Sequence, residues 1–351
     1  MAKKRILTGD RPTGPLHLGH YVGSVANRVS LQYEYDTFII IADLQALTTN
    51  FDRPERLRED VLNVAIDNLA CGLNPSHATL FVQSLVPEIA ELTVIYSNLV
   101  SVQQLSHNPT IKTEAAQYNF GESMPYGFLG YPVSQAADIT FCRAQLVPVG
   151  SDQLPHIEMT RKLVRKFNAT YAPVLIEPEA RVSHVPRLVG LDGNTKMSKS
   201  LGNAIYLSDS PEEIRRKVSI AVTDPARIHP TDKGHPEVCA VFAYHRAFNQ
   251  DSEHSLHDDT PRSTEIEEQC RAGTIGCVPC KKLLADVLNR FLEPIRQRRS
   301  EYERNPDLVL DILSAGSARA RAEGQTTMAL VREAMRMNYF RSRVGQQPDS
   351  R

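Results

Sequence analysis

The sequence contains no apolar run near the roughly 20 residues that a helix needs to cross a bilayer. Its first residues, MAKKRIL, lead directly into a strand pattern and lack the features of a secretory signal. The sequence also has no excess of charge of one sign, because its 40 lysine and arginine residues nearly balance its 41 acidic residues and leave a net charge of -1. We therefore expect a cytoplasmic protein that does not contact membranes. Any contact with nucleic acid must come from a local basic patch.

Cysteine is scarce, with six residues in a chain of 351, and in a reducing compartment we expect no structural disulfides. Hydrophobic residues make up 41% of the sequence and charged residues 23%. These shares are ordinary for a globular protein and exclude wholesale disorder, collagen-like repeats and long coiled coils. The length allows two domains.

The pattern along the chain changes near residue 205. Before it, short apolar runs alternate with amphipathic helical patterns, which predicts an α/β fold with a parallel sheet. Strands are expected at Arg5–Thr8, Thr37–Ile41, Thr79–Val82 and Leu146–Val149. After it the pattern is almost wholly helical. We predict an α/β domain over 1–204, a helical domain over 205–340 and a frayed tail over 341–351.

Two capping signals mark helix starts. Asp52 with Glu55 three residues later predicts one start, and Ser210, Pro211 and Glu213 predict another. Later helices are expected at 237–249, 278–302, 306–315 and 317–337.

The first candidate site follows the first strand, in the run TGDRPTGPLHLGHYVGS. Its glycines permit tight turns and a close backbone approach, and a helix is expected to start near Leu18. A strand, a glycine-rich turn and a helix start together favour an anion site. His17 and His20 can donate hydrogen bonds to phosphate oxygens. Taken alone, the same run also fits a glycine-rich loop with two solvated histidines.

The second candidate site is the run KMSKS, Lys196–Ser200, in a predicted loop. Two lysines three residues apart are mobile point charges that can follow the charge of a departing pyrophosphate. Alone, this run is also typical of a solvated loop. Together with HLGH (His17–His20), it resembles the signature of the class I aminoacyl-tRNA synthetases. The chain length and spacing are similar to the small dimeric members for tryptophan and tyrosine.

The segment Tyr131–Asn168 resembles the bacterial tryptophan-specific branch, with YP-x-x-x-AADI followed by VPVG-x-DQ-x-x-H-x-E-x-TR. The resemblance implies a Rossmann-like catalytic domain that activates L-tryptophan with ATP and Mg²⁺. The tryptophanyl group of the adenylate then passes to the terminal ribose hydroxyl of tRNA(Trp), and AMP leaves. It also implies a homodimer formed by the nucleotide-binding half. Asp138 would accept the indole N–H, a hydrogen bond to a charged group worth about 1.5–3 kcal/mol.

The other roles are carried over by matching motif positions. The catalytic residues implied are His17, His20, Lys196, Lys199 and, on a weak match, Lys112. The ATP-binding residues implied are Arg11, Pro12, Thr13, Gly19, His20, Gly150, Ser151, Asp152, Leu188, Lys196, Met197, Ser198, Lys199 and Ser200. The tryptophan-binding residues implied are Leu7, Tyr131, Gln135, Asp138, Val147, Val149 and Gln153.

Three positions depart from the family pattern. Ser151 stands where an acidic residue is frequent, Gln135 where methionine is common, and Gln45 where histidine is common. The two glutamines lead us to expect a more polar pocket that tolerates substituted indoles.

Four cysteines fall in the helical half, at Cys239, Cys270, Cys277 and Cys280. The last two have a spacing common in metal sites. Some members of the family are similar here and carry a 4Fe–4S cluster. The alternatives are a zinc ion or four free thiols. Nearby, residues 281–304 are rich in lysine and arginine, which the resemblance assigns to the anticodon arm and the bare pattern assigns to a salt-bridged helix face.

Three rival functions remain open from the sequence. A tyrosyl-tRNA synthetase is disfavoured by AADI and VPVGSDQ. A small-molecule nucleotidyltransferase would use HLGH without needing KMSKS or the helical half. A noncatalytic paralogue that binds RNA or a partner protein is disfavoured by the presence of both motifs.

Overall fold

The structure is a computed structural model that describes residues 3–120, 123–150, 153–182, 188–193, 196–199, 201–249 and 261–339. Its centre is a five-stranded sheet in the order β3-β2-β1-β4-β5, and all neighbouring strands are parallel. The predicted α/β fold is confirmed. The strands are β1 (Arg5–Asp10), β2 (Asp36–Ile41), β3 (Ala78–Val82), β4 (Leu146–Val149) and β5 (Glu179–Val182). The sequence did not predict β5.

The apolar run in β2 explains why the sheet is covered on both faces. Successive side chains of a strand point to opposite faces. Phe38 and Ile40 therefore enter one hydrophobic core, and Ile39 and Ile41 enter the other. All four side chains are buried. A continuous apolar run is the pattern of a strand with helices on both sides.

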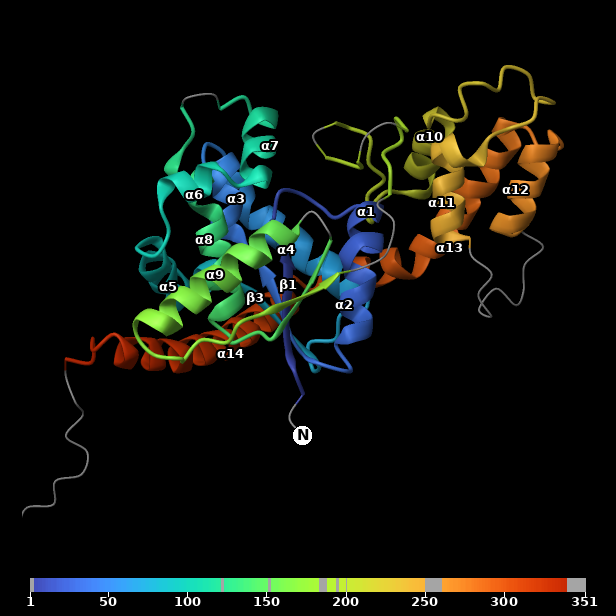
Figure 1. Cartoon of the computed structure of the whole chain (residues 1–351). Coiled ribbons are helices and arrows are strands. Elements are labelled where there is room, and N and C mark those ends of the chain that lie inside the picture. The colour runs from blue at the N-terminus through green and yellow to red at the C-terminus, as the bar shows by residue number, and fades with distance from the viewer. Residues whose placement is uncertain are drawn as a thin grey trace, which may run out of the picture.

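Helices surround this sheet (Figure 1). The first half of the chain supplies α1 (Leu18–His20), α2 (Ala26–Leu31), α3 (Asp43–Asn50), α4 (Pro54–Ala70), α5 (Pro87–Ser97), α6 (Val102–Ser106), α7 (Pro109–Gln117), α8 (Tyr126–Thr140) and α9 (Leu154–Thr170). The second half supplies α10 (Pro211–Ile220), α11 (Ala240–Phe248), α12 (Ser263–Ala272), α13 (Cys277–Arg304) and α14 (Pro306–Ala334). In the described part of the chain, no helix is long and apolar enough to cross a membrane.

The two predicted caps had different outcomes. The Ser210 hydroxyl accepts a hydrogen bond from the Glu213 amide and caps α10, as predicted. The Asp52 cap was wrong, because α4 begins at Pro54 after Arg53, with no side-chain hydrogen bond at its cap. Proline at the first helical position lacks the amide that a cap would satisfy.

The last helix returns to the sheet. In Figure 1, α10, α11 and α12 gather to one side, and α14 runs along the sheet far from them. Helix α13 packs on α10, α11 and also α4, so it reaches from this group to the sheet region. The domain boundary at residue 204 stays a prediction.

Helix α14 covers the outer edge of β3. The Val82 amide donates to the Ser317 hydroxyl at 3.2 Å, although β3 has a strand neighbour only on its other side. Leu313 belongs to the core on one face of the sheet, and Ala320 and Met328 belong to the core on the other. The helix thus crosses the edge and protects its free polar groups from pairing with another chain.

Gly316 permits this crossing. A β-carbon at this position would overlap the carbonyl oxygen of Leu80. The sequence predicted a helix break at this glycine, which was wrong, because α14 is continuous from Pro306 to Ala334. The glycine is needed for close approach between helix and strand, and local pattern alone does not separate that role from a stop signal.

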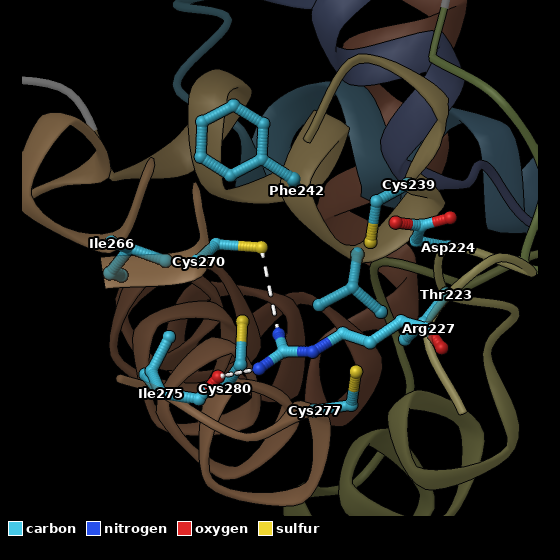
Figure 2. A pocket seen from close by; sticks show the side chains of 11 residues that line it. Thr223, Asp224, Arg227, Cys239, Phe242, Ile266, Cys270, Ile275, Cys277 and Cys280 are labelled. Carbon is cyan, nitrogen blue, oxygen red and sulfur yellow. Dashed lines mark hydrogen bonds between the residues drawn. The ribbon is translucent and has the colours of Figure 1, made fainter. Parts of the chain in front are cut away.

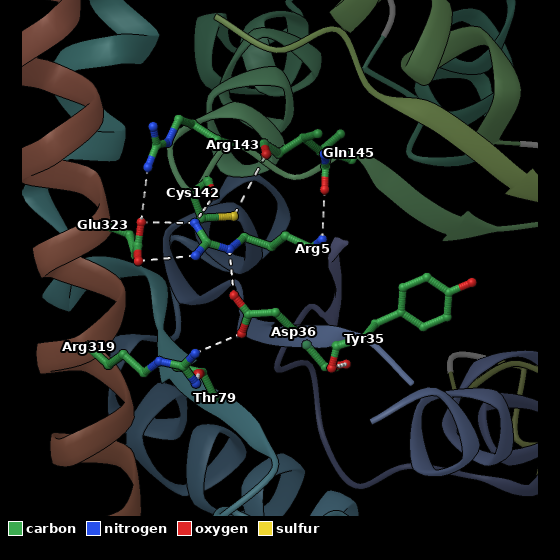
Figure 3. Close-up of polar contacts among 11 residues, drawn as sticks. Arg5, Tyr35, Asp36, Thr79, Cys142, Arg143, Gln145, Arg319 and Glu323 are labelled. Atoms are coloured by element: carbon green, nitrogen blue, oxygen red, sulfur yellow. Dashed lines mark hydrogen bonds and ion pairs between the residues drawn. The ribbon is translucent and has the colours of Figure 1, made fainter. Parts of the chain in front are cut away.

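Ion pairs fix α14 across the ends of the strands (Figure 3). The Arg5 guanidinium donates to Asp36 at 2.8 Å and to both Glu323 carboxylate oxygens at 2.9 and 3.1 Å. Arg319 of the same helix donates to the other Asp36 oxygen at 2.7 Å. Networks with bidentate arginine contacts are the surface pairs that add stability. This network ties α14 to β1 and β2.

The strand order also locates the site. The chain passes from β1 to β2 and β3 on one side, and then returns to β4 and β5 on the other. In open parallel sheets, ligands bind at the carboxyl ends of the strands where this reversal occurs. Strands β1 and β4 are neighbours across this reversal, and the segments that follow both strands were predicted to carry site residues.

Gly316→Ala tests the packing of α14 on the edge strand. Alanine favours a helix by about 1 kcal/mol over glycine, but the clash with Leu80 is expected to cost more. We expect a net loss of about 1–3 kcal/mol in the free energy of unfolding, measured by denaturant titration. Ser314→Ala is the control, because Ser314 is an exposed residue of the same helix. A Gly316→Ala protein as stable as the wild type would show that α14 does not pack this closely.

Candidate functional site

The loop after β1 presents two histidines in a fixed form. The His20 amide donates to Nδ1 of His17 at 3.3 Å, and the His17 amide donates to Nδ1 of His20 at 3.2 Å. The two residues cap the start of α1 reciprocally, and their ring centroids lie 3.7 Å apart. An Nδ1 that accepts a hydrogen bond carries no proton, so each neutral ring has its proton on Nε2. Both rings can therefore donate through Nε2.

The structure brings residues 196–199 against this loop. The Lys199 ammonium donates to the carbonyl oxygen of Gly14 at 2.6 Å. The Gly19 amide lies 3.3 Å from the sulfur of Met197, which is buried. The following segment continues the contact, because the Leu18 amide donates to the carbonyl of Ile205 at 2.9 Å. HLGH and KMSKS thus face one another, although they are far apart in the sequence.

Two glycines, Gly14 and Gly19, lie where the two loops approach each other. Gly14 has a φ of 112°, which non-glycine residues rarely adopt. A β-carbon on Gly19 would come within 3.0 Å of the His17 ring and 3.4 Å of Met197. The glycines therefore allow the two loops to approach closely, where a larger residue would push them apart.

Burial at this loop contact sets the pKa values of its titratable side chains. Desolvation, followed by the charges of His20 and the nearby lysines, lowers the pKa of His17 to about 2. Desolvation likewise lowers the pKa of His20 to about 4, although Asp10 acts in the opposite direction. The pKa of Lys199 falls to about 8, again through desolvation. Near neutral pH both histidines are uncharged donors and Lys199 is mostly charged.

Buried groups that the sequence did not single out support the loop. The Asp67 carboxylate, on α4, accepts the Leu16 amide at 2.7 Å and pairs with Arg299 of α13. Burial raises the pKa of Asp67 to about 6, with Arg299 opposing the shift. Asp10 pairs with the buried Arg28. An acidic residue between the apolar residues Ile66 and Leu69 was the available signal for Asp67.

A second polar centre lies on α8. The Asp138 side chain is only 3% exposed. One of its oxygens accepts from the Gln83 amide at 2.7 Å, and the other accepts from the Gln45 amide. Desolvation raises the pKa of Asp138 to about 7, and the bonds from Gln83 and Gln45 limit the rise. Gln45, noted as a departure from the family pattern, therefore contacts this carboxylate directly, and Gln83 was not predicted.

The remaining predicted pocket residues lie on β1, β4 and α8 and just after β4. Leu7 and Val147 are buried strand residues, and Gln135 is half-buried on α8. The Tyr131 hydroxyl lies 3.0 Å from Nε2 of His156. Val149, Gly150 and Gln153 are half-buried at and just after the end of β4.

Among the predicted nucleotide contacts, Leu188 is buried and accepts the Met197 amide at 3.4 Å. Pro12 is buried, Arg11, Thr13 and Ser198 are half-buried, and Lys196 is exposed. Lys112 is exposed on α7. Ser151, Asp152 and Ser200 lie outside the described residues, as does the predicted tail over 341–351.

The four cysteines of the helical half line one pocket (Figure 2). Arg227 reaches in among their sulfur atoms, and its guanidinium lies 3.7 Å from Sγ of Cys270. Burial raises the pKa of Cys280 to about 12 and also raises the pKa of Cys239 and Cys270. Within the described ranges, no three acidic, cysteine or histidine side chains are spaced closely enough to hold a metal ion.

Comparisons with known proteins agree with one another. The family model described as tRNA synthetases class I (W and Y) matches residues 2–293. The tryptophan–tRNA ligase of Streptococcus mutans is 51% identical over 346 residues, which is 97% of this chain and 100% of the relative. That of Lactococcus lactis is 50% identical over 347 residues, with the same coverage.

Solved structures give the same result. A crystal structure of tryptophanyl-tRNA synthetase from Campylobacter jejuni, complexed with ADP and tryptophan, superposes with a TM-score of 0.82 at 30% identity. The match covers 94% of this chain and 99% of that one.

Proposed function

This chain belongs to the class I tRNA synthetases for tryptophan and tyrosine. On that premise we propose which step of the reaction each part of its site performs. Its function is that of a tryptophan–tRNA ligase. With ATP and Mg²⁺ it converts L-tryptophan to the adenylate and pyrophosphate, and the tryptophanyl group then passes to tRNA(Trp). The tyrosine-specific, nucleotidyltransferase and noncatalytic alternatives are not supported by the tryptophan-specific relatives at about half identity.

The HLGH and KMSKS loops hold the triphosphate between them. A tryptophan carboxylate oxygen attacks the α-phosphorus, and the bond to the pyrophosphate oxygen breaks on the opposite side. His17 and His20 donate Nε2–H bonds to phosphate oxygens, while Lys196 and Lys199 offset the charge of the leaving pyrophosphate. The support is the contact between Lys199 and the Gly14 carbonyl, which puts both motifs on one crevice.

Asp138 selects the amino acid. Its buried carboxylate accepts the indole N–H of tryptophan, and the amides of Gln45 and Gln83 fix its orientation. A substrate without a donor at this point forgoes that hydrogen bond and leaves the buried carboxylate with Gln45 and Gln83 as its only partners, which disfavours its binding. The side chains of Gln45 and Gln135 make the pocket more polar, which favours the binding of substituted indoles.

Residues 205–340 bind the anticodon arm of tRNA(Trp), and residues 1–204 form the catalytic domain and the homodimer contact. The support for tRNA binding is the cluster of lysine and arginine residues on α13 next to the α10–α12 group. Exposed apolar side chains in the first half, such as Val94 and Val102, suit a subunit contact.

Pyrophosphate exchange with each natural amino acid tests the function. We expect exchange with tryptophan, and at least about 1000-fold less with tyrosine or phenylalanine, because phenylalanine has no donor for Asp138 and tyrosine carries its donor at a different position on its ring from the indole N–H. Asp138→Asn should raise the KM for tryptophan at least about tenfold and leave the KM for ATP unchanged. Charging of tRNA(Trp) completes the test. Exchange with tyrosine equal to that with tryptophan would refute the assignment.

The pKa of Lys199 predicts a pH limit. Below about 8 the ammonium is charged, and above that value it is lost, so kcat/KM for ATP should fall by about tenfold per pH unit. Lys199→Arg keeps its charge at every accessible pH. Its profile, normalised to its own maximum, should stay flat above 8. The same decline in both proteins would show that another group sets the limit.

The cysteine pocket would hold a 4Fe–4S cluster or a zinc ion on Cys239, Cys270, Cys277 and Cys280 after its sulfur atoms draw closer together than they are in this structure and Arg227 moves away from Cys270. The support is that all four sulfurs line one pocket and that thiolates suit either group. A bound metal would draw the thiols into their deprotonated form and supply structural stability.

Anaerobic purification followed by metal and sulfide analysis tests this site. A cluster gives iron, sulfide and visible absorbance, and zinc gives a colourless protein with one equivalent of metal per chain. Either result should be lost in a Cys277→Ser, Cys280→Ser double variant, with Cys71→Ser as the control. Protein free of both metals after such purification would refute the proposal.

A further inference from the structure

Two buried atoms of opposite charge lie near the amino-acid pocket without a hydrogen-bond partner. They are Nε of Arg11 and one carboxylate oxygen of Glu114, both within the described residues. Arg11 follows β1, and Glu114 is on α7. Burying polar atoms without partners costs free energy, so each such atom in a native structure calls for an explanation.

Both residues act on the same hydroxyl group. Burial raises the pKa of the Tyr131 hydroxyl, the nearby Glu114 carboxylate raises it further, and the positive charge of Arg11 opposes the shift. The hydroxyl also lies 3.0 Å from Nε2 of His156. Two unpartnered atoms, one cationic and one anionic, therefore converge near one point of α8. Arg11 is held there from its other side, because its terminal nitrogen donates to the Thr49 hydroxyl at 2.7 Å.

The same helix carries the proposed indole acceptor. Tyr131 precedes Asp138 by seven residues, which is two helical turns, so both side chains lie on one face of α8 about 10 Å apart along its axis. A tryptophan molecule whose ring N–H binds Asp138 would extend its backbone atoms along this face. Its α-ammonium and α-carboxylate groups would then reach the region of Tyr131.

We propose that Glu114 binds the α-ammonium group of the amino-acid substrate and that Arg11 binds its α-carboxylate. The proposal rests on the function proposed above, because it takes tryptophan as the ligand. A zwitterion supplies one donor group and one acceptor group, which are the two partners that these buried atoms lack. Both contacts would form only when substrate is bound, and each would be a charge-assisted hydrogen bond.

The two residues have separate effects in this arrangement. Arg11 orients the carboxylate that attacks the α-phosphorus. Once the adenylate has formed, this carboxylate no longer carries its full negative charge, so Arg11 binds it less strongly. Glu114 keeps its ammonium partner through both steps, so it also retains the adenylate. The family resemblance implies instead that Arg11 contacts ATP. The KM for ATP and the Kd for a carboxylate ligand in an Arg11 variant distinguish the two roles.

Three ligands separate the two contacts. Tryptophan has both charged groups, tryptamine has only the ammonium group, and indole-3-propionate has only the carboxylate. The chain itself contains no tryptophan. Indole fluorescence excited where tyrosine does not absorb therefore reports each ligand directly, and Kd can be measured for every variant.

Glu114→Gln should raise the Kd for tryptophan and tryptamine by about tenfold to 100-fold and leave indole-3-propionate unchanged or tighter. Arg11→Gln should do the reverse, weakening tryptophan and indole-3-propionate but not tryptamine. Thr113→Ala is the matched control, because Thr113 is the exposed neighbour of Glu114 on α7. An unchanged KM for ATP in the Glu114→Gln and Thr113→Ala variants confirms an intact site.

Several outcomes would overturn the proposal. Equal weakening of all three ligands would make the residues merely structural, and unchanged Kd values would exclude contact with substrate. If Arg11→Gln raises the KM for ATP and not the Kd for indole-3-propionate, Arg11 serves the nucleotide. Failure of the function itself is distinct, because the wild-type protein would then bind no tryptophan at all.

Discussion

The hydrogen bond from Lys199 to the carbonyl oxygen of Gly14 joins two loops that the rest of the site depends on. Apart, each loop would be a solvated segment with ordinary pKa values. Together they exclude water from His17, His20 and Lys199, and desolvation is the main cause of the lowered pKa of all three. The crevice is thus prepared to gain charge stabilisation from a polyanion, because electrostatic interactions are stronger where water is excluded.

This loop contact is supported from the far end of the chain. Arg299 of α13 pairs with Asp67, and Asp67 accepts the amide of Leu16, which directly precedes His17. The helix that contributes Arg299 also packs on α10 and α11. A change in the position of α13 would therefore act on the backbone beside the first histidine. The region proposed to bind tRNA and the loop proposed to bind ATP share one buried ion pair, whose loss would leave an uncompensated charge.

The sequence predicts those parts of the molecule that depend on local pattern. The apolar run Thr37–Ile41 forms a buried strand because its composition suits no exposed structure, and Ser210 caps its helix because its own hydroxyl reaches the Glu213 amide. The failed cap at Asp52 has a local cause, because Pro54 starts the helix, whereas the failure at Gly316 involves a partner distant in the sequence. Gly316 looked like a helix stop, and only the contact with Leu80 gives its real role.

The same distinction holds for the site. HLGH and KMSKS are short motifs, so their residues can be named from the sequence, and their meeting is a property of the fold. Glu114 and Gln83 carry no motif of their own. Each becomes informative only through a neighbour on another element, Tyr131 for the first and Asp138 for the second. Buried polar atoms without local partners cannot be identified from residue spacing.

The two halves of the site place opposite demands on pH. Asp138 must be ionised to accept an indole N–H, and burial puts its pKa at about 7. Lys199 must be protonated to bind phosphate, and burial puts its pKa at about 8. Desolvation thus narrows the pH range in which Asp138 is ionised and Lys199 is protonated, by raising its lower limit and lowering its upper limit. The amides of Gln45 and Gln83 counter this for the carboxylate, and a bound triphosphate raises the pKa of Lys199, so substrate binding widens the window that burial narrowed.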